Sequence, residues 1–551
     1  MSAIAGLWRF DGRPEPAADC ARMLASQEIY GPHDLRQWSE GPLAMGRRLF
    51  RTLPEDVHDR QPLQSRDGNL TLVADVRLNN RDELTAALGM APDHARQSCD
   101  AAILLECLAR WGEAALDRLS GDFAFALWDA RGQRLLLARD FRGQRPLHYH
   151  RGHGFFAFAS MPKGLHALAE IPREPDERAV CELLTLMPQH GTRSFFKNIE
   201  RVESASCVAV TRDGVSIRRY WNPQRSSAPR RKTEDYVEGL RHHLDQATQS
   251  MLRGANGAVG SHLSAGFDSS AVTATAARLL APSGGKVVAF TSVPREGYDG
   301  ADMRNRFGDE GPLAAATAAM YPNIEHVLIR SGHLSPLDGL DRQFFLYDRP
   351  VLNPCNMVWS DAINQAARTR KLTVMLNGQM GNMTVSYSGL PLLPELLRAG
   401  RLFQLWRTGS QLVAHSGMRW RGVFANTFGP FLPVALWQWL NTTFTGATWD
   451  ISEYTAIRKE RAANLAALAH ERDLDFGYRP WADGFAMRLW VMRRMDIGNF
   501  NKGALAGWGV DRRDPLADKR LVEYCLSIPT NVYLDGGVQR AGLVADRDHR
   551  R

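Results

Sequence analysis

The sequence predicts two domains of different fold class, an α+β domain of layered antiparallel sheets followed by an α/β domain with a parallel sheet and a helical C-terminal part. Three observations support this prediction. A length of 551 residues is too great for one hydrophobic core. The first 215 residues read as short strands between turn signals, whereas strands alternate with helices from residue 233 onward. A content of 44% hydrophobic and 23% charged residues excludes collagen-like, coiled-coil and wholly disordered chains.

The first domain, residues 1–215, is predicted from strands that carry aromatic and aliphatic side chains between turns. Asp11-Gly12 and Arg131-Gly132 are turn signals of this kind. Helices are expected near Asp82–Leu88 and Asp100–Arg110. The expected strands are Ala3–Phe10, Leu70–Leu78, Phe123–Trp128, Arg134–Ala138 and Gly154–Ala159.

A linker at residues 216–232 is expected to separate the domains, because Asn222–Lys232 is polar, basic and contains proline. The second domain, residues 233–551, begins with an amphipathic helix at Glu234–Arg253. A strand, a Ser/Gly loop, a helix and another strand follow, which is the order of a parallel α/β unit. These elements are expected at Gly257–Leu263, Ser270–Leu280 and Val287–Ser292, with further strands at Glu325–Ile329 and Leu372–Leu376. The region beyond about residue 390 is expected to be mostly helical.

Charge, cysteine content and hydropathy exclude several classes of protein. A net charge of +8 is mild for this length and does not indicate nucleic-acid binding. Seven cysteines without a CxxC pair argue against a disulfide framework or a structural zinc site. The N-terminal residues do not form a secretory signal, and no run of about 20 apolar residues indicates a membrane span. We therefore expect a soluble, cytoplasmic protein.

The stretch Ser261–Ala277, SHLSAGFDSSAVTATAA, predicts an anion-binding loop between a strand and a helix. Small residues at Ser264–Gly266 let the backbone approach an anion, and Ser269-Ser270 begin the helix, where free N–H groups favour negative charge. Asp268 would repel a bare phosphate, so its presence indicates a bridging Mg²⁺. An ordinary capped helix after a strand is the alternative interpretation.

The string SAGFDSS resembles the SGGxDSS pyrophosphate loop of the asparagine synthetase family and other ATP pyrophosphatases. The resemblance implies an ATP-pyrophosphatase (adenine nucleotide α-hydrolase-like) fold for the second domain, with ATP and Mg²⁺ bound. It also implies a chemistry in which a carboxylate becomes an acyl-adenylate, pyrophosphate leaves, and a nitrogen nucleophile displaces AMP. The nucleotide contacts expected from it are Ser264, Ala265, Gly266, Phe267, Asp268, Ser269, Ser270, Ser292, Asn377, Gly378 and Gln379.

The resemblance covers nearly the whole chain. The N-terminal region is similar to the glutaminase domain of this family, which implies an Ntn-hydrolase (class II glutamine amidotransferase-like) fold. The similar segments are Tyr30–Asp34, Arg47–Leu49, Leu119–Asp129 and Leu137–Leu147. Farther along, Asp511–Asp518 (DRRDPLAD) resembles the EARVPFLD segment, and Leu521–Pro529 resembles the helix that follows it.

Two departures from the family pattern indicate that the first domain has lost glutaminase activity. Glutamine-hydrolysing members have a nucleophilic cysteine where this chain has Ser2, and a serine hydroxyl is a far weaker nucleophile without a strong base. The oxyanion-hole Asn-Gly corresponds to Ala74-Asp75, and an aspartate there opposes a developing oxyanion. A serine hydrolase is the alternative for this domain.

The segment Leu376–Gly389, LNGQMGNMTVSYSG, resembles lasso peptide cyclases rather than the SGEGADELFGGY segment of asparagine synthetases. Asn382 would replace the second metal-binding aspartate of the family, and Asp309 or Glu310 would supply compensating charge. The expected metal ligands are therefore Asp268, Asn382 and Glu310. A glycine-rich loop after a buried strand, with no ligand role, is the alternative.

The same resemblance suggests further catalytic residues beside Asp268. Asp348, in LYDRPVLNP, resembles a region on the acceptor side of the cleft, and a solvated surface aspartate is the alternative. Lys502, in FNKGALAG, corresponds to the RMSMA region. Arg540 is the nearest match to the lysine that the family uses to stabilise the acyl-adenylate.

Three functions remain open. The resemblance favours an ATP-dependent macrolactam synthetase that acts on the core peptide of a lasso precursor, with a leader peptidase and a leader-peptide-binding protein as partners. The second function is another amide ligase that uses ammonia or forms a different ring, such as a β-lactam. The third is a non-catalytic binding protein. Tryptophans could line a large peptide cavity or form a helical core, namely Trp406, Trp420, Trp437, Trp439, Trp449, Trp481 and Trp490.

Overall fold

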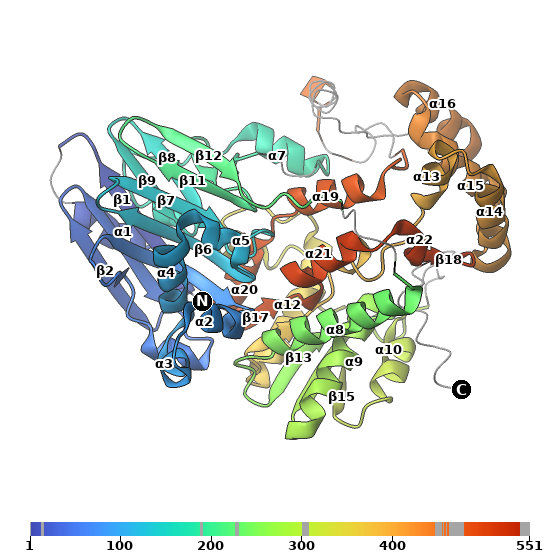
Figure 1. The fold of residues 1–551 in the computed structure, drawn as a ribbon, viewed down its shortest axis with the longest axis horizontal. Coiled ribbons are helices and arrows are strands. Elements are labelled where there is room, and N and C mark those ends of the chain that lie inside the picture. Colours follow the sequence, from blue (N-terminus) through green and yellow to red (C-terminus); the bar gives the residue numbers. More distant parts are fainter. Residues whose placement is uncertain are drawn as a thin grey trace.

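The computed structural model describes residues 2–12, 16–187, 191–225, 231–299, 308–446 and 479–539, together with residues 455, 457, 458, 460 and 461. The first domain lies on the left of Figure 1, and the second domain lies to its right. Helices α13 to α16 form the far end of the second domain. The two domains meet along α20 and β17.

The first domain contains two six-stranded antiparallel sheets, packed face to face. The first sheet has the order β10-β8-β9-β1-β3-β2, and the second has the order β12-β11-β7-β6-β5-β4. The strands of the first sheet are β1 (Ser2–Arg9), β2 (Asp34–Glu40), β3 (Leu43–Leu49), β8 (His148–Gly152), β9 (Phe155–Ala159) and β10 (Glu200–Arg201). Those of the second are β4 (Leu63–Gln64), β5 (Leu70–Leu78), β6 (Gly121–Asp129), β7 (Arg134–Arg139), β11 (Ser206–Val210) and β12 (Val215–Arg219).

Three apolar clusters hold these layers together. Trp8, Val73 and Ala126 belong to the cluster between the sheets, where alternate residues of each strand point inward. Helix α1 (Pro16–Ala25) covers the outer face of the first sheet. Helices α2 (Arg81–Leu88) and α4 (Asp100–Trp111) cover the outer face of the second. The predicted α+β class with layered antiparallel sheets is confirmed.

The second domain is built on a parallel five-stranded sheet with the order β15-β14-β13-β16-β17. Its strands are β13 (Ala258–His262), β14 (Lys286–Val293), β15 (Ile324–Arg330), β16 (Val374–Leu376) and β17 (Asp511–Arg513). Helix α9 (Phe267–Leu280) packs against α8 (Thr233–Met251) and α10 (Gly311–Ala318), and α8 and α9 share an apolar cluster with the sheet. Helices α11 (Leu340–Tyr347), α12 (Pro354–Thr369) and α20 (Gly498–Trp508) share a different cluster with it. The predicted α/β class is confirmed.

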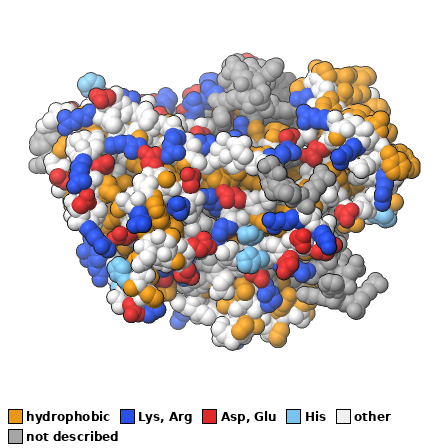
Figure 2. All heavy atoms as spheres, viewed as in Figure 1, with side chains coloured by type: hydrophobic (Ala, Val, Ile, Leu, Met, Phe, Trp, Pro, Cys, Tyr) orange, Lys and Arg blue, Asp and Glu red, His pale blue; other side chains and the backbone are white. Residues whose placement is uncertain are grey.

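The C-terminal helical part consists of α13 (Leu392–Arg398), α14 (Leu402–Ser416), α15 (Trp420–Phe428), α16 (Val434–Thr445), α19 (Gly484–Arg494), α21 (Lys519–Ser527) and α22 (Thr530–Tyr533). The tryptophans of this part that the structure describes are not buried. Trp406 and Trp439 are 61% and 62% exposed, so they do not form a helical core. Figure 2 shows hydrophobic side chains gathered over the end of the molecule that α14–α16 form. Trp449 lies outside the described residues.

Three further features bear on the sequence predictions. Strand β12 pairs with β11, so the sheet continues beyond residue 215, where the first domain was expected to end. All seven cysteines lie in the described part of the chain and are free. No described helix combines the length and the hydrophobicity needed to cross a bilayer.

Candidate active site

The segment Ser264–Ser270, hereafter the phosphate loop, comprises residues of the loop after β13 and the first turn of α9, and two of its serines contact each other. The hydroxyls of Ser264 and Ser269 lie 2.7 Å apart, and the backbone N–H of Ser264 donates to Ser269 Oγ at 3.0 Å. The backbone N–H of Gly266 donates to Ser264 Oγ at 3.1 Å. Gly266 precedes the first turn of α9 and is exposed, so this end of the helix is accessible to an anion.

The segment Asn377–Asn382, hereafter the glycine-rich loop, lies directly against the phosphate loop. A methyl group added at Gly381 would lie 1.9 Å from Asp268 Cγ, and one at Gly378 would lie 3.0 Å from the carbonyl carbon of Asp268. Only glycine therefore lets the two loops approach so closely. Asn377 is held in place because its backbone N–H donates to Arg513 O at 2.9 Å.

The strand order explains why the two loops meet. β13 pairs with β14 on one side and with β16 on the other, and all three strands are parallel. Strands β14 and β15 are added on one side of β13, whereas β16 and β17 are added on the other side. In open α/β sheets, ligands bind beyond the carboxyl ends of the strands at the point where the strand order reverses in this way. Ser292, near the carboxyl end of β14, lies at the same edge of the sheet.

Asp514 supports the glycine-rich loop from the next strand along. It follows β17, and its carboxylate accepts from the backbone N–H groups of Met380 at 2.9 Å and Leu516 at 3.0 Å. Burial raises the pKa of Asp514 to about 7, and the nearby charge of Asp268 acts in the same direction. Sequence reasoning missed this residue, although it lies within the quoted DRRDPLAD segment.

The donor set beside Asp268 suits a Mg²⁺ that is shared with phosphates. The described residues contain no cluster of three His, Cys, Asp or Glu side chains that would form an all-protein metal cage. Asn382 follows Gly381 on the glycine-rich loop and is exposed, with its Oδ1 accepting from Ser386 Oγ at 3.4 Å. Glu310 directly precedes α10, which packs against α9. Mg²⁺ is usually held by one or two carboxylates together with substrate phosphates, so the chemistry of Asp268 beside the phosphate loop fits the ion.

Two of the expected catalytic residues make polar contacts with the first domain. Asp348 is 8% exposed and accepts from the backbone N–H of Lys163 at 2.9 Å, with Lys163 Nζ 3.4 Å away. Lys502 is fully buried, and its ammonium donates to Ser2 O and to Asp75. Both residues therefore join the second domain to the first. Arg540, the third expected residue, lies outside the described residues.

Lys502 lies beside Ser2 and Asp75, the positions at which the sequence departs from the glutaminase pattern. Asp75 Oδ1 accepts from the backbone N–H of Ser2 at 2.9 Å, and Asp75 Oδ2 accepts from Lys502. Burial alone would raise the pKa of Asp75, but the charges of Lys502 and Arg145 hold it below the usual value. Burial lowers the pKa of Lys502, and the adjacent Asp75 counters this effect. A buried salt bridge beside Ser2 therefore spans the two domains.

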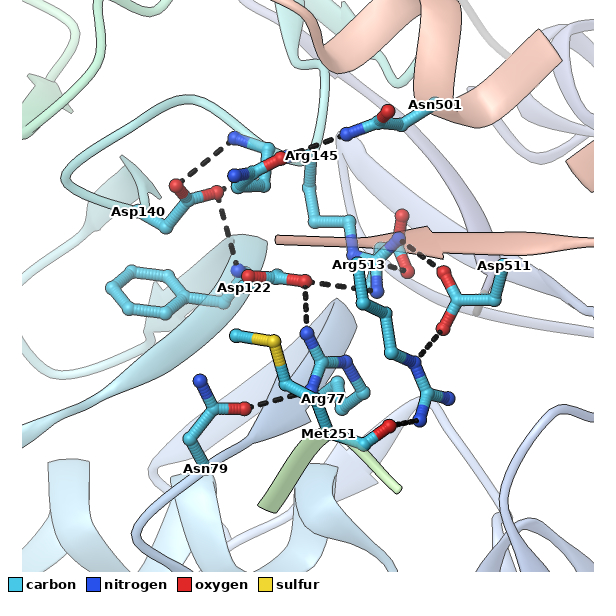
Figure 3. Close-up of polar contacts among 12 residues, drawn as sticks. Arg77, Asn79, Asp122, Asp140, Arg145, Met251, Asn501, Asp511 and Arg513 are labelled. Atoms are coloured by element: carbon cyan, nitrogen blue, oxygen red, sulfur yellow. Dashed lines mark hydrogen bonds and ion pairs between the residues drawn. The ribbon is translucent and has the colours of Figure 1, made fainter. Parts of the chain in front are cut away.

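The surrounding interface is a network of buried arginines and aspartates (Figure 3). Arg145 lies between three carboxylates, with ion-pair distances of 3.5 Å to Asp122, 3.6 Å to Asp511 and 3.9 Å to Asp75. Arg513 donates through Nε to Asp511 at 2.7 Å. Because Asp511 and Arg513 belong to β17, this network connects the first domain to the strand that directly precedes Asp514.

The raised pKa of Asp348 leads to a testable prediction about stability. Burial raises the pKa of Asp348 to about 6, so the folded state holds this proton more tightly than the unfolded chain does. The protonated Asp348 side chain stabilises the folded state fully below about pH 4, and this stabilisation is lost as the pH rises towards 6. Asp348→Asn mimics the protonated form, so we expect the stability of the wild type relative to this variant to fall by about 2–3 kcal/mol across that range.

The measurement is the melting temperature of both proteins between pH 4 and pH 8. The exposed Asp213, in the turn between β11 and β12, gives a matched control as Asp213→Asn. Parallel melting curves for the wild type and Asp348→Asn over the whole range would contradict the prediction.

Comparison with known proteins gives matches on both domains. The family described as glutamine amidotransferase domain matches residues 1–221, and the family described as asparagine synthase matches residues 239–545. Asparagine synthetase [glutamine-hydrolyzing] 3 of Bacillus subtilis (strain 168) is 28% identical over 336 residues, which are 60% of this chain and 54% of that protein. The chain therefore spans about half the length of this relative.

Two further similarities are more limited. Amidase chyE of Penicillium rubens is 28% identical over 246 residues, which are 43% of this chain and 35% of that protein. A solved structure of glutamine phosphoribosylpyrophosphate amidotransferase from B. subtilis, complexed with ADP and GMP, is 15% identical with a TM-score of 0.29. It covers 55% of this chain and 69% of that one.

Proposed function

Because this chain belongs to the asparagine synthetase family, we propose that it is an ATP-dependent, AMP-forming carbon–nitrogen ligase that closes a macrolactam in a core peptide. In the proposed reaction, a side-chain carboxylate of the peptide attacks the α-phosphorus of ATP and pyrophosphate leaves. The N-terminal amine of the same peptide then attacks the acyl carbon, AMP departs, and one proton is released. The sum is the loss of one water from the peptide.

The geometry of the phosphate loop is the main support for this proposal. It presents the exposed N-terminal end of α9 to an anion, and its Asp268 faces Gly378 and Gly381 of the glycine-rich loop. A bound Mg²⁺ would neutralise charge on the leaving pyrophosphate. Ser264 and Gly266 shape the backbone of the loop, and Asp514 fixes the glycine-rich loop through Met380. Positioned donors of this kind stabilise charge that develops in the transition state.

An intramolecular amine is favoured over glutamine as the nitrogen source. The serine at position 2 is 3% exposed, and the neighbouring ammonium of Lys502 donates to the carbonyl oxygen of Ser2 and to Asp75 rather than to a hydroxyl. Lys502 is therefore not placed as a base for a serine nucleophile. Asp75 brings a negative carboxylate where an oxyanion would need donors.

The glycine-rich loop and the exposed tryptophans on α14 and α16 support a peptide substrate. The loop has an amide at Asn382 in place of a carboxylate, as in the resemblance to lasso peptide cyclases. Holding a prefolded peptide raises the effective concentration of amine and carboxylate and excludes water from the adenylate. A leader peptidase and a leader-peptide-binding protein are the partners that this substrate would require.

A second candidate is an amide ligase that uses free ammonia. The curated relative from B. subtilis is an asparagine synthetase, and this observation favours it. Both candidates share formation of an acyl-adenylate, so ATP–pyrophosphate exchange alone does not separate them.

The deciding experiment incubates the purified chain with ATP, Mg²⁺ and a leader-free peptide that contains an internal Asp or Glu. Mass spectrometry should show loss of one water and release of AMP, both dependent on the free N-terminal amine. An acetylated peptide is the matched control and should remain uncyclised. Formation of an amide from added ammonia with equal efficiency, and no ring, would favour the second candidate instead.

Glutamine is not expected to serve this enzyme as a nitrogen donor. Glutamate release from glutamine should stay at the buffer background, measured with a coupled glutamate assay. Ser2→Cys restores the thiol but not the oxyanion donors, and Asp75 and Lys502 still fill the site, so it should not restore hydrolysis. Hydrolysis by Ser2→Cys above that of the wild type would show that the site remains competent.

A further inference from the structure

A cavity of about 700 Å³ lies between α8, α13, α19 and the α21–α22 segment, all labelled around the right centre of Figure 1. No residue of the phosphate loop or of the glycine-rich loop lines it. It is therefore separate from the candidate active site. The elements that surround it belong entirely to the second domain, apart from the segment that leads into α8.

The lining of this cavity is strongly cationic. Four arginines contribute to it, and Glu395 is the one carboxylate among its lining residues. Glu395 accepts from Thr530 at 3.1 Å, and burial raises its pKa, which favours its neutral form. Arg231 and Arg401 are exposed and their side chains make no polar contact within the described structure. Two guanidinium groups are thus available to an anionic ligand.

Arg488 gives this cavity a buried cationic side chain in addition to the exposed arginines. Its side chain is 3% exposed, and its Nη1 donates to Cys525 O at 2.9 Å. The guanidinium lies 4.5 Å from the ring centroid of Tyr387 and 5.5 Å from that of Tyr533. The carbonyl contact and the two aromatic rings hold the guanidinium in place, so its positive charge has a fixed position at the cavity wall.

The walls between the arginines are apolar. Leu392, Leu396, Phe485 and Ile528 all contribute to them. An inorganic phosphate has no apolar surface to bury against such side chains, whereas a peptide segment offers both carboxylates and aliphatic groups. Arginine pairs with carboxylates through two parallel hydrogen bonds, which gives orientation as well as affinity.

We propose that this cavity binds an acidic segment of the peptide substrate, at a position away from the reacting carboxylate. This inference rests on the proposed function, because it names where that peptide is held. The contact between Arg488 and Tyr387 connects the cavity wall to the segment that follows the glycine-rich loop. A peptide anchored in the cavity is thus held beside the element that bounds the active site.

The test is fluorescence anisotropy with the full chain and no ATP. A fluorescein-labelled decapeptide with two Asp and two Glu among aliphatic residues is compared with the same peptide carrying Asn and Gln. We expect the acidic peptide to bind at least tenfold more tightly, and Arg231→Glu combined with Arg401→Glu to remove at least tenfold of its affinity. Both arginines are exposed, so this variant should fold normally.

The matched control reverses two exposed arginines of the first domain, Arg66→Glu and Arg212→Glu, and should bind within twofold of the wild type. Arg488→Gln provides a second variant and should also weaken binding. Equal affinity for acidic and amide peptides, or an unchanged affinity in the double variant, would overturn the proposal. So would release of the peptide by sodium phosphate but not by sodium chloride of equal ionic strength, since that identifies a phosphate site.

Failure of this proposal is distinguishable from failure of the proposed function. The double Arg231/Arg401 variant is assayed for peptide-dependent ATP–pyrophosphate exchange. If its KM for the peptide is unchanged, the cavity is not the peptide-binding site, although the chain is still a ligase. Exchange with a raised KM and a similar kcat is the result that supports it.

Discussion

Replacing Asp268 by alanine is expected to reduce peptide-dependent ATP–pyrophosphate exchange and ring closure by about 10²–10³-fold or more. Asp268 is the carboxylate in the first turn of α9, and it lies directly against Gly378 and Gly381 of the glycine-rich loop. Its loss would remove the anchor for Mg²⁺ and leave the charge of the departing pyrophosphate uncompensated. Both activities should fall together, because ring closure depends on prior adenylation.

The two activities are measured by exchange of labelled pyrophosphate into ATP and by mass spectrometry of the peptide. Circular dichroism and the melting temperature should stay close to those of the wild type, since Asp268 lies at the accessible end of its helix. More than one tenth of wild-type exchange in Asp268→Ala would be incompatible with the assigned role.

Gly381→Ala tests the same geometry without removing the carboxylate. The new methyl group would lie 1.9 Å from Asp268 Cγ, so the carboxylate of Asp268 or the glycine-rich loop must move. We expect a comparable loss of exchange, with the charge of Asp268 retained. Gly214→Ala is a suitable control, because a methyl group there would meet no atom within 4 Å. Wild-type exchange in Gly381→Ala would show that the close contact of the loops is not needed.

The phosphate loop was predictable because its information is local. Strand, small residues, aspartate and helix all lie within Ser261–Ala277, and the structure forms them in that order. The glycine-rich loop was recognised in the same way, after a buried strand. That Gly381 touches Asp268 depends on β13 pairing with β16, which the sequence alone does not specify.

Buried polar side chains account for much of what sequence reasoning missed. β3 carries the arginines of LAMGRRL and was not predicted as a strand, yet every residue in it is buried. Arg47 of this strand is satisfied by Asp34 at 3.0 Å and Asp59 at 2.5 Å. Such ion pairs form between segments that are distant in the chain, and the periodicity of hydrophobic residues in the sequence does not predict them. The buried contact of Lys502 was not predicted for the same reason, since its partner Asp75 is 427 residues away in the chain.

Replacing Lys502 by methionine is expected to lower the free energy of unfolding by about 3–5 kcal/mol, because it leaves a carboxylate buried without its main counter-charge. The side chains of Lys502 and Asp75 are both fully buried. Arg145, the remaining cation beside Asp75, is 3.9 Å away and is shared with Asp122 and Asp511. Methionine fills a similar volume, so the loss reflects charge rather than a cavity.

The double variant Lys502→Met with Asp75→Asn separates the charge effect from a general loss of packing. Asparagine keeps an oxygen for the backbone N–H of Ser2, and no buried charge is left unpaired. Replacing both partners of a buried ion pair with neutral groups is often close to neutral in stability, whereas removing one partner is costly. We therefore expect denaturant unfolding to show that the double variant regains most of the stability that Lys502→Met loses. If instead the two losses add, the salt bridge is not what joins the domains at this point, and Lys502 must stabilise them through its other contact, with the carbonyl oxygen of Ser2.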